Sequence, residues 1–166
     1  MPGAVFLKLT DIPGDTTDDQ HSDEIEVLGW NWGLNRGGTQ DVTGRTTAGK
    51  VSGQEFTFQK YMDSSSPVLL KHVCDGQGIK EGILTVQTSG GADEKVEALV
   101  LLMEDVTLTS FTPGGAGEAG QNIPTESVSM TCKRFTYKYT GQKPDSHADA
   151  SSDQGWDLDK DVTHSA

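Results

Sequence analysis

The most informative part of the chain is the segment Glu24-Ile25-Glu26-Val27-Leu28-Gly29-Trp30-Asn31-Trp32-Gly33. Side chains of a β-strand alternate between its two faces, so Trp30 and Trp32 share one face with Leu28. Asn31 then points to the opposite face. Each buried aromatic ring brings a contact area of roughly 150 to 250 Å². The segment therefore predicts a strand whose tryptophans anchor a core or a subunit interface.

The bulk composition indicates a single β domain covering residues 1–166. A chain of 166 residues can bury roughly 70% of its unfolded surface in one domain. The chain has 33% hydrophobic residues and 20 glycines, which is typical of strands separated by many turns. Thirteen basic and 25 acidic residues give a net charge of −12, so binding to nucleic acid is not expected.

No membrane insertion and no leader are predicted. The longest apolar run, Ala98 to Met103, is far shorter than the ~20 residues of a membrane helix. The first eight residues contain no basic segment and no sustained apolar core, so no cleavable signal peptide is expected. Synthesis in the cytoplasm follows from this prediction.

Periodicity predicts further strands and one short helix. Ser66 is the expected N-cap, Pro67 the first helical residue, and Gly76 the residue just past the end of about two turns. Glu94 to Phe111 is predicted as a central strand covered on both faces. The other strands are expected at residues 5–10, 51–60, 79–88 and 127–139, the last with a bulge at Lys133-Arg134.

Residues 35–50 form an arm without apolar periodicity. They contain four glycines and four threonines, and structureless connections longer than about 12 to 15 residues are uncommon in compact domains. Two interpretations remain open, a floppy loop and an arm that becomes ordered only against a neighbouring subunit. The residues expected to make that contact are Asn35, Gly37, Gly38, Gly44 and Gly49.

The C-terminal part is acidic. Residues 141–154 are polar and rich in aspartate, which predicts a mobile linker. A final strand is expected at residues 155–163, with Trp156 docking back onto the sheet as an anchor. Six aspartates and a single basic residue, Lys160, occupy residues 145–166, so assembly of several copies could depend on salt.

No catalytic, cofactor or metal site is predicted. Gly115 to Gly120 matches G-x-G-x-x-G, but a strand and not a helix follows, so a hairpin connection is the better interpretation. The four histidines are scattered, and Cys74 and Cys132 are expected to be reduced, passive thiols. The carboxylates of residues 15–26 are interpreted as a solvated acidic face.

Several motifs, in one order along most of the chain, resemble the haemolysin-coregulated protein family, the tube component of bacterial type VI secretion systems. They are Phe6-Leu7-Lys8-Leu9, Asp11-Ile12-Pro13-Gly14, His21 with Glu24 to Gly33, Phe56 to Asp63, Ser66-Pro67-Val68-Leu69, Leu84-Thr85-Val86 and Gly155-Trp156. The resemblance implies a small β-barrel or two-sheet antiparallel sandwich with one short helix.

The resemblance also implies a structural role without enzyme activity. Six copies would form a ring, and rings would stack into a hollow tube that carries small effector proteins. The contractile sheath and spike proteins would be partners, and export would need no cleavable signal peptide. Under this hypothesis residues 35–50 contact the next subunit or the next ring, and Asn31 faces the lumen while Trp30 and Trp32 are buried.

Two alternatives remain open. One is a monomeric β-sandwich that binds a small ligand or a glycan through Tyr137, Tyr139 and Trp156. The other is a phage-like tail-tube protein, which shares the assembly and differs in origin.

Overall fold

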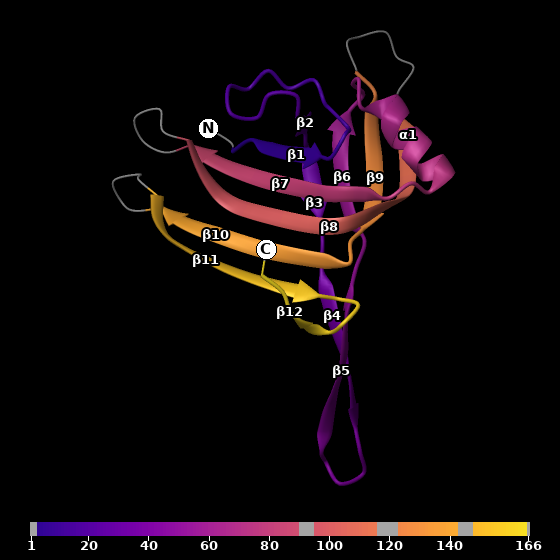
Figure 1. Cartoon of the computed structure of the whole chain (residues 1–166), viewed down its shortest axis with the longest axis vertical. Helices are drawn as coiled ribbons and strands as arrows, with labels where there is room; N and C mark the ends of the chain where they lie inside the picture. The colour runs from indigo at the N-terminus through magenta and orange to yellow at the C-terminus, as the bar shows by residue number, and fades with distance from the viewer. Residues whose placement is uncertain (1–2, 90–94, 116–122, 143–147, 166) are drawn as a thin grey trace.

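Two antiparallel β-sheets, one helix and a projecting hairpin make up the molecule (Figure 1). The computed structural model describes residues 3–89, 95–115, 123–142 and 148–165. The predicted fold class, mainly β with antiparallel sheets and one short helix, is confirmed. The Gly90-Gly91 pair, whose sequence predicts a hairpin turn, and most of the G-x-G-x-x-G segment lie outside the described residues.

The larger sheet follows the order β12-β11-β10-β8-β7-β1-β2. Its strands are β12 (Val162–Thr163), β11 (Ala148–Asp157), β10 (Arg134–Gln142), β8 (Lys95–Gly114), β7 (Ile79–Ser89), β1 (Val5–Leu9) and β2 (Ile25–Glu26). Apolar residues meet across neighbouring strands, since Leu84 of β7 pairs with both Leu7 and Leu101. All three side chains are fully buried, so this face of the sheet forms the core.

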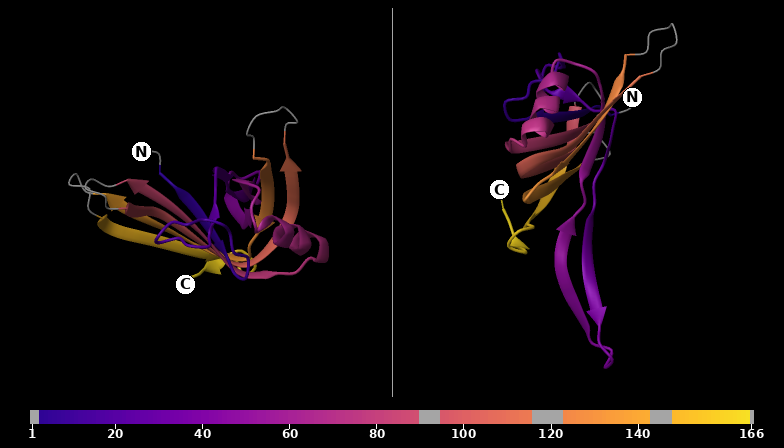
Figure 2. Two further views of the ribbon diagram at one scale, coloured as in Figure 1. Left: turned by 90° about the horizontal axis from the view of Figure 1, so that it is seen from above. Right: turned by 90° about the vertical axis from the view of Figure 1, so that its right-hand side faces the viewer.

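The smaller sheet joins β3 (Gly29–Asn31), β6 (Phe56–Tyr61), β9 (Thr125–Thr131) and the distal part of β8. Phe58 lies at its centre, opposite Trp30 on one side and Val128 on the other. Phe58 and Val128 are fully buried. Seen from above, the two sheets diverge from the line where β8 crosses between them (Figure 2).

The chain changes sheet at two corners. β8 pairs with β10 up to Glu104 and with β9 from Thr107 onward, and Asp105 between them has a φ of 53°. β9 ends at Thr131, and β10 begins at Arg134 in the other sheet. The predicted bulge at Lys133-Arg134 is therefore a break between two strands, which is how strands turn sandwich corners.

The long strand β8 is central, as predicted, but it is not covered equally on both faces. Leu99, Leu101 and Met103 are buried, whereas Val100 and Leu102 are half-buried. The prediction of double coverage is wrong because the second face of β8 has only partial cover in a single copy of the chain.

Helix α1 (Ser66–Asp75) packs against β8. Its N-cap is Ser65 and not Ser66, so the prediction was one residue too late. The ten-residue helix is also longer than the predicted two turns. Gly76 ends it as expected, with a left-handed φ of 68° and its N–H donated to the carbonyl of His72.

Four other sequence predictions need correction. The segment 24–33 is not one strand, because β2 and β3 are separated at Val27 and Leu28. Residues 51–60 are likewise two strands, β6 being separated from the preceding strand by Gln54 and Glu55. Residues 148–154, predicted as linker, belong to β11, and the expected strand 155–163 consists of the end of β11, a turn and β12.

Candidate functional site

The arm predicted at residues 35–50 is a β-hairpin that projects away from both sheets (Figure 1, Figure 2). Its strands are β4 (Leu34–Gln40) and β5 (Thr46–Gly53), which form a separate two-stranded sheet. Every residue of both strands is exposed except Val51, which is half-buried. The segment is therefore neither a floppy loop nor an arm that is ordered only against a neighbouring subunit, because β4 and β5 pair within one copy of the chain.

The tip of the hairpin is a preformed turn around Asp41. The Asp41 carboxylate accepts hydrogen bonds from the Thr43 hydroxyl at 2.6 Å, the Thr43 N–H at 2.9 Å and the Arg45 N–H at 3.0 Å. These bonds, that of the Thr43 hydroxyl first, hold the pKa of Asp41 below its usual value. Gly44 supplies the left-handed φ of 80° that the turn needs.

The predicted contact residues have different roles in this hairpin. Asn35, Gly37 and Gly38 lie in β4, Gly49 lies in β5, and Gly44 lies in the turn. A Cβ on Gly49 would come within 2.6 Å of the Gly37 carbonyl oxygen, so this pair lets the two strands approach closely at the bulge between Arg36 and Gly38.

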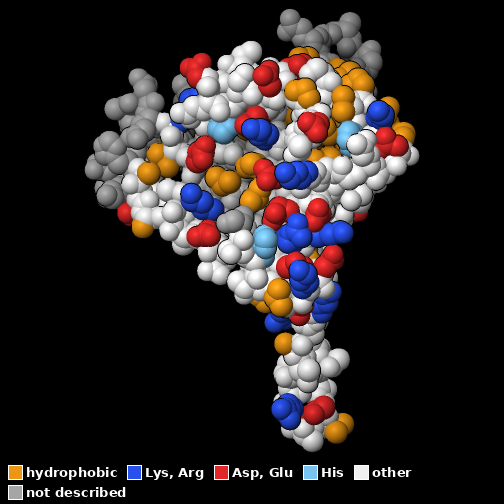
Figure 3. All heavy atoms as spheres, viewed as in Figure 1, with side chains coloured by type: hydrophobic (Ala, Val, Ile, Leu, Met, Phe, Trp, Pro, Cys, Tyr) orange, Lys and Arg blue, Asp and Glu red, His pale blue; other side chains and the backbone are white. Residues whose placement is uncertain are grey.

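The base of the hairpin is joined to the body by long-range contacts. The Gln54 N–H donates to the Gly33 carbonyl at 2.8 Å, and the Lys50 ammonium donates to the Asp159 carbonyl at 2.9 Å. A surface groove of about 390 Å³ lies beside them, with Trp32, Cys132 and Leu158 among its lining residues. Figure 3 shows basic and acidic side chains gathered around this base, whereas the shaft carries few charges.

The predicted anchors pack against the core, but none is fully buried in a single copy of the chain. Trp30 stacks on Phe56 with ring centroids 6.1 Å apart. Trp32 meets Phe135 edge-on at 4.8 Å, and Trp156 lies opposite Phe135 in the sheet. Asn31 is exposed on β3.

Leu28 does not share the environment of the tryptophans. It is 44% exposed, and it lies before β3 begins. The prediction of a single contact face for Leu28, Trp30 and Trp32 is therefore wrong for Leu28.

Both cysteines are free thiols, Cys74 exposed and Cys132 half-buried. Burial raises the pKa of Cys132 from 9.0 to about 11. The folded protein therefore favours the neutral thiol. The free energy of unfolding falls as the pH rises from 9.0 to about 11, because only the unfolded chain ionises this thiol readily there.

At pH 8 we expect Cys132 to react with iodoacetamide about a hundredfold more slowly than an unfolded cysteine peptide, because its thiolate fraction is that much smaller. Mass spectrometry of the alkylated peptides measures this rate. Unfolding in urea should remove the difference, and equal rates in the folded protein would contradict the burial of this thiol.

The described residues contain no group of three or more histidine, cysteine, aspartate or glutamate side chains that could hold a metal ion. His72, close to Cys74 in sequence, instead lies 2.9 Å through Nδ1 from the Val68 carbonyl oxygen. In this part of the chain we also find no helix with the length and apolar character to cross a membrane.

The chain is similar in sequence to a known protein family. The family described as "Type VI secretion system effector, Hcp" matches residues 6–139. The chain belongs to the haemolysin-coregulated protein (Hcp) family. Protein hcp1 of Pseudomonas aeruginosa is 33% identical over 159 residues, which cover 95% of this chain and 96% of that relative. The resemblance inferred from the sequence motifs is therefore confirmed, and the chain is a type VI secretion tube or effector protein.

Two solved structures share the fold over nearly the whole chain. A structure described as a type six secretion system protein has a TM-score of 0.89 at 25% identity, with 98% of this chain and 99% of that chain covered. Hcp1 from Salmonella typhimurium has a TM-score of 0.81 at 27% identity, with 99% and 100% covered. Since both matches cover at least 98% of this chain, they extend past residue 139, where the family match ends.

Proposed function

We propose that this Hcp chain is a tube subunit that assembles into hexameric rings, which stack into a hollow tube exported by the type VI apparatus. The observation that carries the proposal is the projecting hairpin, whose strands are exposed along nearly their whole length. A two-stranded hairpin is marginally stable alone in water. Contact with a neighbouring copy would bury its surface and hold it in one orientation.

An open sheet edge supports ring formation. Within the described residues, β12 pairs only with Trp156 and Asp157 of β11, and the preceding residues 148–154 are exposed. Exposed strand edges readily pair with another chain. A head-to-tail contact of this kind closes into a ring when each copy is rotated by a fixed angle.

The remaining parts of the proposal concern the lumen and the partners. We propose that Asn31 faces the lumen, and its exposure beside two tryptophans that pack against the core supports this. The lumen would carry small effector proteins, and the contractile sheath and spike would be further partners. We assign the chain no catalytic role and no cofactor, and it would leave the cytoplasm without a cleavable signal peptide.

Shortening the hairpin tests the proposal. Deleting residues 38–48 leaves Gly37, Gly49 and Lys50 as a three-residue connection between the paired Arg36 and Val51, a length that hairpins accept. We expect the wild-type chain to form hexamers and tubes, and the shortened chain to lose stacking while it stays folded. Light scattering on a sizing column and electron-microscope images measure both.

The controls separate loss of assembly from loss of fold. Urea unfolding of the shortened chain should match the wild type, because the deleted residues bury almost no surface. Tubes formed equally by both chains would contradict the role of the hairpin. A wild-type monomer at low and high salt would contradict the ring itself and favour the ligand-binding alternative, for which Tyr137 and Tyr139 are 43% and 54% exposed.

A further inference from the structure

The acidic C-terminal segment meets the base of the hairpin at Asp161. This residue lies in the turn between β11 and β12 with a left-handed φ of 56°. Its Oδ1 accepts the indole N–H of Trp156 at 3.1 Å and the backbone N–H of Val51 at 3.4 Å, and lies 3.6 Å from a guanidinium nitrogen of Arg36. One carboxylate therefore contacts both hairpin strands and the body.

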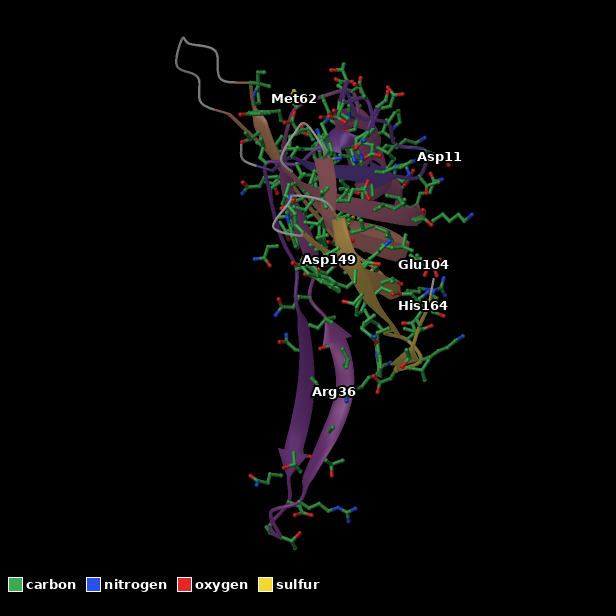
Figure 4. All side chains as sticks on the ribbon, turned by 90° about the vertical axis from the view of Figure 1, so that its left-hand side faces the viewer. Asp11, Arg36, Met62, Glu104, Asp149 and His164 are labelled. Atoms are coloured by element: carbon green, nitrogen blue, oxygen red, sulfur yellow. The ribbon has the colours of Figure 1, made fainter. Side chains whose placement is uncertain are left out.

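Two neighbouring contacts strengthen this junction. The Arg36 guanidinium lies over the Trp156 ring, 5.8 Å from its centroid, a distance that allows a cation–π attraction. Leu158 packs closely against Gly53: a Cβ added at Gly53 would lie 3.0 Å from Cδ1 of Leu158. Figure 4 shows Arg36 on the hairpin strand that leads away from the body.

The turn that carries Asp161 is itself held in place. The Asp157 carboxylate accepts the N–H groups of Lys160 at 2.9 Å and Asp159 at 3.0 Å. These bonds, that of Lys160 first, hold the pKa of Asp157 below its usual value. The Leu158 N–H also donates to the Lys133 carbonyl at 2.8 Å. The turn is therefore anchored to the larger sheet before it meets the hairpin.

We infer that Asp161 is a positioning residue that fixes the direction in which the hairpin leaves the body. The inference rests on the proposed function, because a fixed direction matters only when the tip must reach another copy. The shaft beyond Arg36 and Val51 rises about 3.3 Å per residue and extends roughly 20 Å. A tilt of about 10° at the base would therefore move the tip by about 3 to 4 Å, comparable to a hydrogen-bond length.

The test replaces Asp161 with glycine, which removes the carboxylate and tolerates a left-handed φ. Amide hydrogen exchange on the full-length chain measures how often the base of the hairpin opens. The variants are compared in fractions of equal native mass. We expect the Val51 amide and its neighbours to exchange at least about tenfold faster, and tubes to become fewer. Asp161→Asn should have a smaller effect, because its amide oxygen can still accept the two N–H groups.

Asp159→Gly is the matched control. It loosens the same turn by the same substitution, but its side chain is 66% exposed and lies 4.0 Å from Lys133, and its carbonyl still accepts Lys50. We expect hairpin exchange close to wild type and normal assembly.

The outcomes are distinguishable. Unchanged exchange in Asp161→Gly, or an equal increase in Asp159→Gly, would overturn the inference. Faster exchange with unchanged tubes would overturn the role of this contact in assembly. Failure of the wild-type chain to form rings would instead count against the proposed function, while the exchange rates would still decide whether Asp161 holds the hairpin.

Discussion

Replacing Lys60 by methionine should lower the free energy of unfolding by about 3 to 5 kcal/mol, the usual cost of breaking a buried ion pair from one side. The Lys60 side chain is fully buried. Its ammonium lies 3.0 Å from Glu126, 2.8 Å from Asp63 and 3.1 Å from the Ser66 hydroxyl. Without the ammonium, the carboxylate of Glu126, which is 1% exposed, loses the positive charge that lies 3.0 Å from it. Urea unfolding measures the loss.

The location of this network explains why the effect should be large. Lys60 belongs to β6, Glu126 to β9, and Ser66 is the first residue of α1. The Ser66 hydroxyl donates to Glu126 at 2.7 Å. One buried cluster therefore joins the start of the helix to two adjacent strands of the smaller sheet.

Two further variants check the explanation. Lys80→Met removes an exposed ammonium and should change the stability by less than about 0.5 kcal/mol. The double variant Lys60→Met with Glu126→Leu should recover part of the loss, because a well-packed apolar pair can replace a buried ion pair. A single-variant loss below about 1 kcal/mol would contradict the buried network.

The burial of Lys60 could be inferred from the sequence, but its partner in this cluster could not. In the strand predicted at residues 51–60, alternation puts Phe56 and Phe58 on one face, and both are buried. Lys60 has the same parity, so its burial could have been inferred. Its partner could not be inferred, because Glu126 lies 66 positions away and no local pattern links the two. Ser66 was predicted as the N-cap, but its hydroxyl hydrogen-bonds with Lys60 and Glu126 in this cluster.

The hairpin and β11 show a different limit. Strands are recognised by alternation between buried and exposed residues, but β4 has no buried residue and most of β11 is exposed. A strand without a buried face gives no periodic signal, so residues 35–50 were predicted without strands and 148–154 as linker. The contacts of Asp161 with the hairpin could not be predicted either, since Val51 is 110 positions away.

The segment with the tryptophans was predicted more accurately, because its buried positions carry apolar residues that can be recognised in the sequence. Ile25 and Val27 are buried, and Trp30 and Trp32 pack against the core. The break at Val27 and Leu28 was missed, although the apolar residues change there from odd positions to even positions. Parity predicted correctly that Trp30 and Trp32 share a side, but it wrongly grouped Leu28 with them because the segment was treated as one strand.

Gly155→Ala should destabilise the protein by roughly 1 to 3 kcal/mol, the usual cost of forcing an extra carbon into a filled site. A Cβ on Gly155 would lie 2.2 Å from the His164 carbonyl oxygen and 2.9 Å from the Phe135 carbonyl oxygen. Both atoms belong to the backbone, so no side chain can move aside. The strand pair β11 and β12 must separate, and the bond from the His164 N–H to the Gly155 carbonyl at 3.0 Å would be lost.

Gly29→Ala is the matched control, because it also lies in a strand but a Cβ there would meet nothing within 4 Å. Thermal unfolding should separate the two variants, with Gly29→Ala within about 0.5 kcal/mol of wild type. Because the turn between β11 and β12 carries Asp161, Gly155→Ala should also speed exchange of the Val51 amide. Equal stability losses in both variants would contradict the close approach at Gly155, whereas a selective loss with unchanged Val51 exchange would show that the hairpin does not depend on the C-terminal turn.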